Sequence, residues 1–380
     1  MWVNGARAAY SRPNRHELVI TPVHPIAAGE RFTVKVIHDG YPAKIRHDGE
    51  RGVFANGREM IVMGEPHAAA WWYAANDHPR DKATYDVTTR VRRGKQVVSN
   101  GNLISQRRAG DWTVFHWRAH QPMAPYLAFF AAGGFGMERG RTPSGTRFVL
   151  AVSRALSSSA QREAWQLMRR TGAVQSWLEQ RLGAYPFDVT GGLTTSIRMG
   201  FALETQTRPM YPAVGGVRED WVLAHELSHQ WFGDAVSVES WRDIVLNEGL
   251  ATYMQVWWTQ RHSADQPASM RTWLQDTYDD ASDDFWTLRI GDPGPVRLFD
   301  EPVYVRGAMF FQAIRNVIGE APFRALLRGL VTSHRYRNAS IADFQALAEQ
   351  LGGQDLDALF DAWLMQPTKP AHTEILGLAS

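Results

Sequence analysis

The sequence contains no cysteine among its 380 residues. Disulfide bridges and thiolate metal sites are therefore excluded, and the cellular compartment is left open. An apolar run of membrane-spanning length is missing too, because PYLAFFAAGGF is too short and is interrupted by glycine. The first residues, MWVNGARAAYSRPNR, lack the apolar core of a signal peptide. We expect no membrane span in this chain.

A strong net charge is also absent, since the formal charge is +2 at pH 7. We therefore expect no nucleic-acid partner. The charge is unevenly distributed: residues 1–150 carry a net charge of +9, and the remainder carries −7. An acidic second half suits a substrate with a cationic end, although two solvated surfaces of different sign explain the asymmetry equally well.

The most informative stretch is HELSHQWFGDAVSVESWRDIVLNEG, residues 225–249. His225 and His229 are four residues apart, so on a helix both imidazoles lie on one face and can bind one metal ion. Glu226, beside the first of them, is placed to act on a metal-bound water. Eighteen residues separate His229 from Glu248, which a second helix could bring to the metal as a third ligand. Two His, one Glu and an open position describe a catalytic zinc site.

The alternative is a core helix that carries two histidines by chance. The flanking residues Leu223, Leu227, Trp231 and Phe232 give this segment an apolar face in either case. We expect the first helix over about 220–232 and the second over about 243–262. The correctly spaced Glu248 favours the metal site over a plain core helix.

The organisation of the chain predicts two domains. Residues 1–150 contain alternating or β-branched runs, such as HELVITPV and DWTVFHWRA, punctuated by Asn-Gly and Asp-Gly turns. Residues 151–380 are mainly helical, beginning with one helix that has an N-cap at Ser157 to Ser159 and a stop at Gly183. We place the boundary near Leu150 and find no internal repeat.

Three segments together resemble the aminopeptidase N family, a branch of the gluzincins. HELSHQWFGDAV with WRDIVLNEGLATY resembles the zinc signature of that family. Residues 200–205, GFALET, resemble its exopeptidase loop, and residues 304–308, YVRGA, resemble its Y-x-K/R-G-A segment. The resemblance implies an α+β fold, with an antiparallel β-domain over 1–150 and a thermolysin-like zinc metallopeptidase domain over 151–380. It also implies a β-domain that is incomplete at its start, and no large helical C-terminal domain.

The same resemblance assigns roles to single residues. One Zn²⁺ ion is held by His225, His229 and Glu248, and Glu226 transfers the proton. Tyr304 donates a hydrogen bond to the oxyanion. Glu204, with Ala202 in the same loop, binds the α-ammonium of the substrate, and Glu65 lines the same amine pocket. The loop departs from the family pattern at Phe201, Leu203 and Thr205, and these departures affect the expected wall of the first side-chain pocket more than the amine anchor.

These features predict a monomeric zinc-dependent aminopeptidase that hydrolyses the N-terminal bond of peptides with a free N-terminus. Two alternatives stay open. A zinc endopeptidase of the same fold would share the metal chemistry but would not need Glu204. A catalytically silent binding module would have lost signature residues. Here all four residues of the zinc signature are present, namely His225, Glu226, His229 and Glu248.

Overall fold

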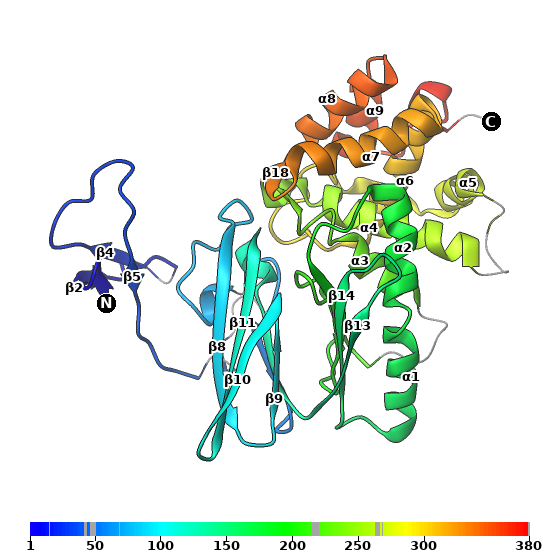
Figure 1. The fold of residues 1–380 in the computed structure, drawn as a ribbon. Helices are drawn as coiled ribbons and strands as arrows, with labels where there is room; N and C mark the ends of the chain where they lie inside the picture. The colour runs from blue at the N-terminus through cyan, green and yellow to red at the C-terminus, as the bar shows by residue number, and fades with distance from the viewer. Residues whose placement is uncertain are drawn as a thin grey trace.

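The computed structural model describes residues 1–378 except 15, 42–43, 46–50, 68, 214–219, 263–266 and 268. Figure 1 shows a β-domain, in blue and cyan, beside a second part in which helices cover a sheet. The expected α+β class, an antiparallel β-domain followed by a mixed sheet with a helical lobe, is confirmed.

The β-domain packs two antiparallel sheets against each other. Phe115 and Trp117 point inward from the central strand of one sheet, and Val97 of the other sheet lies in the same buried cluster. The first sheet consists of β10 Asn102–Ala109, β11 Trp112–Met123 and β8 Ala83–Arg92, in spatial order. The second consists of β6 Val53–Ala55, β7 Met60–Val62, β12 Phe130–Gly133 and β9 Gln96–Ser99.

Short strands at the N-terminus form two further small sheets, which Figure 1 shows at the outer side of the β-domain. One contains β2 Ala6–Arg7, β1 Trp2–Val3 and β5 Val34–Lys35. The other pairs β3 Ala9–Ser11 with β4 Val19–Thr21. Two single turns of 3-10 helix, η2 Ala69–Trp71 and η3 Pro125–Leu127, complete the domain.

A four-stranded sheet forms one layer of the second part. Its strands in spatial order are β13 Phe135–Arg141, β14 Arg147–Ser153, β15 Val189–Thr194 and β16 Met210–Tyr211. β13 and β14 are antiparallel, whereas β14, β15 and β16 run parallel. Leu150 lies inside β14, so strand pairing joins residues on both sides of the expected boundary, and the division of the chain at that residue stays a prediction.

Two helices, not the expected single one, follow β14: α1 Ser158–Met168 and α2 Thr171–Leu182. The expected ends are confirmed. The Ser157 side chain accepts a hydrogen bond from the Ala160 amide, and Gly183 ends α2 with a φ of 94°. The helix is interrupted at Arg169 and Arg170, a break that the pattern of apolar residues does not reveal.

The helical lobe holds the largest buried cluster, which also reaches into the sheet. Its α-helices are α3 Asp220–Ser228, α4 Val245–His262, α5 Met270–Asp280, α6 Glu301–Ile318, α7 Glu320–His334, α8 Ile341–Gly352 and α9 Asp357–Phe360. Shorter elements are β17 Val236–Val238, β18 Arg337–Ala339, η5 Trp241–Asp243, η6 Asp283–Thr287, the π-helical turn η7 Asp361–Met365 and η8 Glu374–Leu376.

None of the helices in the described residues is both long enough and apolar enough to cross a bilayer.

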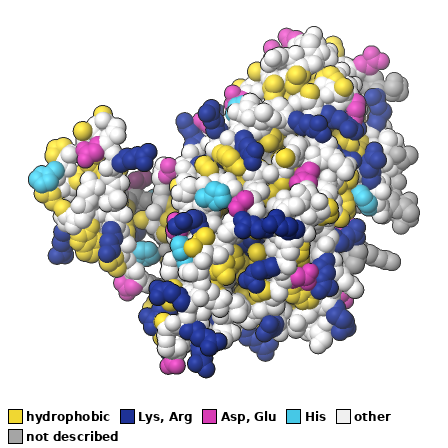
Figure 2. Space-filling model, viewed as in Figure 1, with side chains coloured by type: hydrophobic (Ala, Val, Ile, Leu, Met, Phe, Trp, Pro, Cys, Tyr) yellow, Lys and Arg dark blue, Asp and Glu magenta, His cyan; other side chains and the backbone are white. Residues whose placement is uncertain are grey.

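The basic excess of the first 150 residues is visible on the surface. Figure 2 shows more Lys and Arg than acidic side chains over the lower part of the β-domain. On the sheet that contains β8 and β11, the Arg90 and Arg92 guanidinium groups lie 4.6 and 4.2 Å from the centre of the Trp112 ring.

Candidate active site

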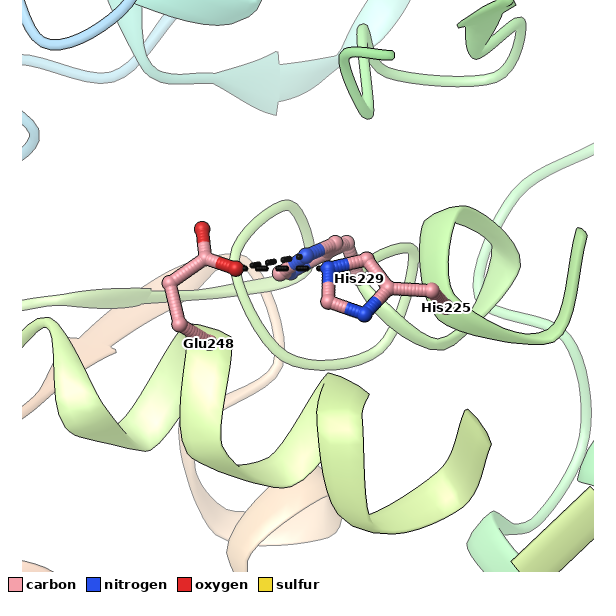
Figure 3. Close-up of side chains that lie close together, drawn as sticks. All are labelled: His225, His229 and Glu248. Carbon is pink, nitrogen blue, oxygen red and sulfur yellow. Dashed lines mark ion pairs between the residues drawn. The ribbon is translucent and has the colours of Figure 1, made fainter. Parts of the chain in front are cut away.

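The two histidines and Glu248 meet between α3 and α4 (Figure 3). α3 carries His225, and His229 follows one residue after the last residue of that helix. Glu248 lies in the first turn of α4. One oxygen of Glu248 is 3.3 Å from His225 Nε2 and 3.5 Å from His229 Nε2. The structure thus brings these three side chains together, although they belong to different elements.

These distances fit a single metal ion. Ligand atoms about 2.0–2.1 Å from one tetrahedral ion lie about 3.3–3.4 Å from each other. The Glu248 oxygen lies at about this distance from both histidine nitrogens, all three atoms lie within 4.8 Å of one another, and the cavity beside them leaves room for a fourth position. Zinc is the ion for which two imidazoles and one carboxylate are a common catalytic set.

The other ring nitrogen of each histidine is held by an oxygen. His225 Nδ1 lies 3.0 Å from Gln255 Oε1, and His229 Nδ1 lies 3.1 Å from the Phe232 carbonyl. Both oxygens can only accept, so each Nδ1 carries the hydrogen and each Nε2 presents its lone pair to the ion. Gln255 escaped the sequence analysis, yet it lies seven residues after Glu248, two turns along the same face of α4.

Burial and mutual attraction together set the pKa values of His229 and Glu248. Burial lowers the pKa of His229, but Glu248 and then Glu204 outweigh it, and the net effect is a raised pKa. Burial raises the pKa of Glu248, but His229 and His225 outweigh it and bring the pKa to about 2. His229 and Glu248 therefore favour each other's charged forms in this buried site.

Glu226 is also buried, with 6% of its surface exposed. A carboxylate oxygen of Glu226, one of Glu204 and a ring nitrogen of His229 lie within 4.8 Å of one another. Burial raises its pKa well above the ordinary value; His229 opposes this effect, and Glu204 and Glu248 add to it. The environment of this carboxyl group therefore favours its protonated form more than water does, which suits a group that takes up and returns a proton.

Tyr304, on α6, lines the same cavity as the histidines. Its ring stacks on the His225 ring, with centroids 6.2 Å apart and an angle of 23° between the planes. Burial, and after it Glu248, raise the pKa of the phenol above its ordinary value. The hydroxyl group thus stays protonated and can donate a hydrogen bond into the cavity.

Two more carboxylates converge on Glu248. Glu204 follows the loop after β15, and Glu65 reaches in from the β-domain, shortly after β7. Oxygens of these three residues lie within 4.8 Å of one another. Burial raises the pKa of both Glu65 and Glu204. Oε1 of each is buried without a hydrogen-bond partner among the described residues. A cationic hydrogen-bond donor in this end of the cavity would satisfy both oxygens.

All eight residues to which the family resemblance assigns a role line one cavity of about 630 Å³, Ala202 included. The cavity also has an aromatic rim that the sequence motifs do not identify. Phe201, Trp221 and Phe299 are 42%, 41% and 37% exposed. The first of them belongs to the loop that departs from the family pattern.

Two ionisable residues near the site, Asp234 and Lys82, were also missed. Asp234, five residues after His229, is fully buried, and neither of its carboxylate oxygens has a hydrogen-bond partner in the described chain. Lys82 of the β-domain donates to the backbone carbonyls of Asp234 and Ala235, at 3.0 and 3.1 Å. The lysine thus ties the β-domain to the turn that follows the metal-binding histidines.

Comparison with known proteins gives consistent matches along the chain. A family described as "Peptidase family M1 domain" matches residues 217–363, and "Peptidase M1 N-terminal domain" matches residues 6–127. Probable aminopeptidase 1 of Sulfurisphaera tokodaii is 25% identical over 353 residues, covering 83% of this chain and 42% of the relative. Aminopeptidase N of Lactococcus lactis is 23% identical over 355 residues, covering 87% of this chain and 41% of the relative.

Solved structures agree in fold. The M1 zinc metallopeptidase from Deinococcus radiodurans superposes with a TM-score of 0.80 at 23% identity, covering 97% of this chain and 84% of that one. The chain spans about two-fifths of the length of the curated relatives that it matches.

Proposed function

This chain belongs to the M1 peptidase family, and from that premise we propose that it is a zinc-dependent aminopeptidase. It removes the first residue from peptides that have a free N-terminus. The observation that carries this proposal is the pair of unsatisfied buried carboxylate oxygens, on Glu65 and Glu204, beside the two histidines and Glu248. A substrate α-ammonium satisfies both oxygens and fixes the distance to the first peptide bond.

His225, His229 and Glu248 would hold the zinc ion. When bound there, zinc supplies Lewis acidity toward the scissile carbonyl and lowers the pKa of a coordinated water to about 7. Glu226 takes the proton of the attacking water on its carboxylate and then gives it to the leaving amine nitrogen. Its raised pKa supports the second transfer, because burial favours the protonated form from which the amine nitrogen receives the proton.

Tyr304 serves the other side of the reacting carbon. Its protonated hydroxyl donates to the carbonyl oxygen as negative charge develops there. Glu204 is held in place through its backbone, since Gln230 Nε2 donates to its carbonyl oxygen at 3.0 Å. The amine anchor is therefore fixed relative to the metal-binding segment that contains Gln230.

An endopeptidase would bind substrates whose N-terminus is blocked. Such a substrate brings no cation to Glu65 and Glu204, and it leaves two buried acceptors unpaired, which costs about 1–3 kcal/mol for each group. Leucine amide and N-acetyl-leucine amide separate the two functions. We expect hydrolysis of the free amine only, its loss with a chelator, and its return with zinc.

Glu204→Gln tests the anchor in the same assay. The variant should lose hydrolysis of leucine amide while its zinc content, measured by elemental analysis, stays at one ion per chain. Equal hydrolysis of the acetylated substrate by the parent enzyme would favour the endopeptidase instead. A parent enzyme that binds zinc and cleaves neither substrate would favour the silent binding module.

A further inference from the structure

A second cavity lies beside the proposed active site. Its volume is about 410 Å³, and among the described residues the only charged groups in its lining are Arg51 and Arg198. Both side chains are exposed, and the described residues offer neither of them an ion pair. The described lining of this cavity thus carries positive charge and no acidic side chain, whereas four glutamates line the catalytic cavity.

One continuous segment joins the two cavities. Residues 196–198 line the basic cavity, and residues 200–204 line the catalytic one. Between the cavities, Phe54 of β6 meets Phe201 of this segment edge to face, with ring centroids 5.9 Å apart. Phe54 also lines the basic cavity, so each ring belongs to one of the two hollows.

The backbone of this segment is open. Leu203 pairs with Met210 through two hydrogen bonds, which fixes the end nearest Glu204. Residues 198–202, by contrast, make no backbone hydrogen bond with any described part of the chain. Unpaired and exposed backbone groups of this kind accept an added strand.

The length of the segment limits the distance between its ends. Six residues separate Arg198 from Glu204, so their Cα atoms are at most about 20 Å apart. An extended peptide of about six residues covers that distance, and the reach of the arginine side chains shortens it further. A short peptide can thus touch both cavities at once.

We propose, on the basis of the proposed aminopeptidase function, that Arg51 and Arg198 bind the C-terminal carboxylate of short peptide substrates. A short peptide is positive at one end and negative at the other. The glutamates receive its α-ammonium, the open backbone of residues 198–202 runs beside its main chain, and the arginines receive its carboxylate. The enzyme is therefore selective for oligopeptides of about three to six residues with a free C-terminus.

The test compares Leu-Ala-Ala with its C-terminal amide, which differs only in the charge at the end of the chain. We expect kcat/KM for the free acid to exceed that for the amide by about 2- to 5-fold at low salt, as for an exposed charge pair. The advantage should appear mainly in KM, because it is a binding interaction that persists in the transition state. It should shrink as salt is added.

Arg51→Gln combined with Arg198→Gln should abolish the advantage of the acid and leave hydrolysis of the amide unchanged. Arg107→Gln, on exposed β10, is the matched control and should retain the advantage. Equal rates for acid and amide in the parent, or an advantage that survives in the double variant, would overturn the proposal and leave the aminopeptidase function standing. Hydrolysis of neither peptide would overturn both.

Discussion

Gly249 and Gly307 touch backbone to backbone where α4 packs on α6. A β-carbon added to Gly307 would lie 2.7 Å from the Gly249 Cα, and one added to Gly249 would lie 2.9 Å from the Gly307 Cα. Glu248 precedes the first glycine by one residue, and Tyr304 precedes the second by three. The close approach of the two helices therefore sets the distance between a proposed metal ligand and the proposed oxyanion donor.

Gly307→Ala should separate these helices. A methyl group has no space at this position, and overpacking of this kind costs about 1–3 kcal/mol of stability. We expect a lower midpoint of urea unfolding together with a lower kcat, because Tyr304 moves away from Glu248. Gly329→Ala on α7 is the control: its β-carbon would lie 3.3 Å from Leu347 Cδ2, the end of a flexible side chain. If the Gly307 variant keeps the stability and kcat of the parent, the helix contact does not position the site.

This contact shows what the sequence reveals and what it hides. The spacing of His225, Glu226 and His229 is local, so helix geometry suffices to place the two imidazoles on one face. Glu248 belongs to the next helix, and its convergence was expected from the motif spacing and the family resemblance. Gly249 and Gly307 lie in recognised motifs, but nothing in the sequence shows that they touch, since 57 residues separate them. Packing between distant segments is decided by the whole core.

Glu65 illustrates the same limit in the active site. It comes from the β-domain and meets Glu204 and Glu248 through the packing of two domains, so only family resemblance pointed to it. The break between α1 and α2 was not predicted for a related reason. Apolar residues continue on both sides of Arg169 and Arg170, and periodicity shows burial rather than continuity of the helix.

Tyr304→Phe tests the proposed oxyanion donor. Removing the hydroxyl should lower kcat by about 10²–10³, the usual cost of losing one such donor. The raised pKa keeps the phenol protonated, so deprotonation of Tyr304 should not limit the activity of the parent up to about pH 10. Zinc content should not change. Tyr278→Phe removes another phenol hydroxyl, outside the cavity, and should leave kcat unaltered. An unchanged kcat in the Tyr304 variant would assign the oxyanion to another donor.

Gln255→Leu tests the support of the metal site. Its Oε1 accepts from His225 Nδ1 and thereby fixes the tautomer and the direction of that ring. Loss of such a partner typically lowers metal affinity about 10- to 100-fold. Competition with a fluorescent zinc chelator measures the effect. Gln260→Leu, on the same helix but outside the cavity lining, should keep the affinity of the parent; the same loss in both variants would point to a general disturbance of α4.

Glu59→Ala tests the junction between the domains. Glu59 is buried in the β-domain and accepts hydrogen bonds from the Thr195 hydroxyl at 2.7 Å and from the Ser196 amide and hydroxyl at 3.1 and 3.0 Å; Ser153 also donates to it. Truncation leaves several buried donors without an acceptor, which should cost about 3 kcal/mol in the free energy of unfolding. Glu59→Gln keeps one carbonyl acceptor and should fall between parent and Ala variant. Equal stability of all three would mean that water replaces the carboxylate.

Zinc affinity should rise with pH, and the direction follows from His229. In the metal-free site the neighbouring glutamates raise its pKa, so the imidazole holds a proton through neutral pH. The folded state thus gains stability from this proton at low pH and loses it as pH rises through the raised pKa. Zinc needs the neutral ring, and its binding must release that proton. The affinity should therefore increase about tenfold for each pH unit between pH 6 and pH 8.

Chelator competition at several pH values gives the slope of zinc affinity against pH, and proton release can be followed with a pH indicator during zinc addition. A slope of zero, with no proton released, would mean that His229 is already neutral in the metal-free enzyme and that its pairing with Glu248 is not ionic.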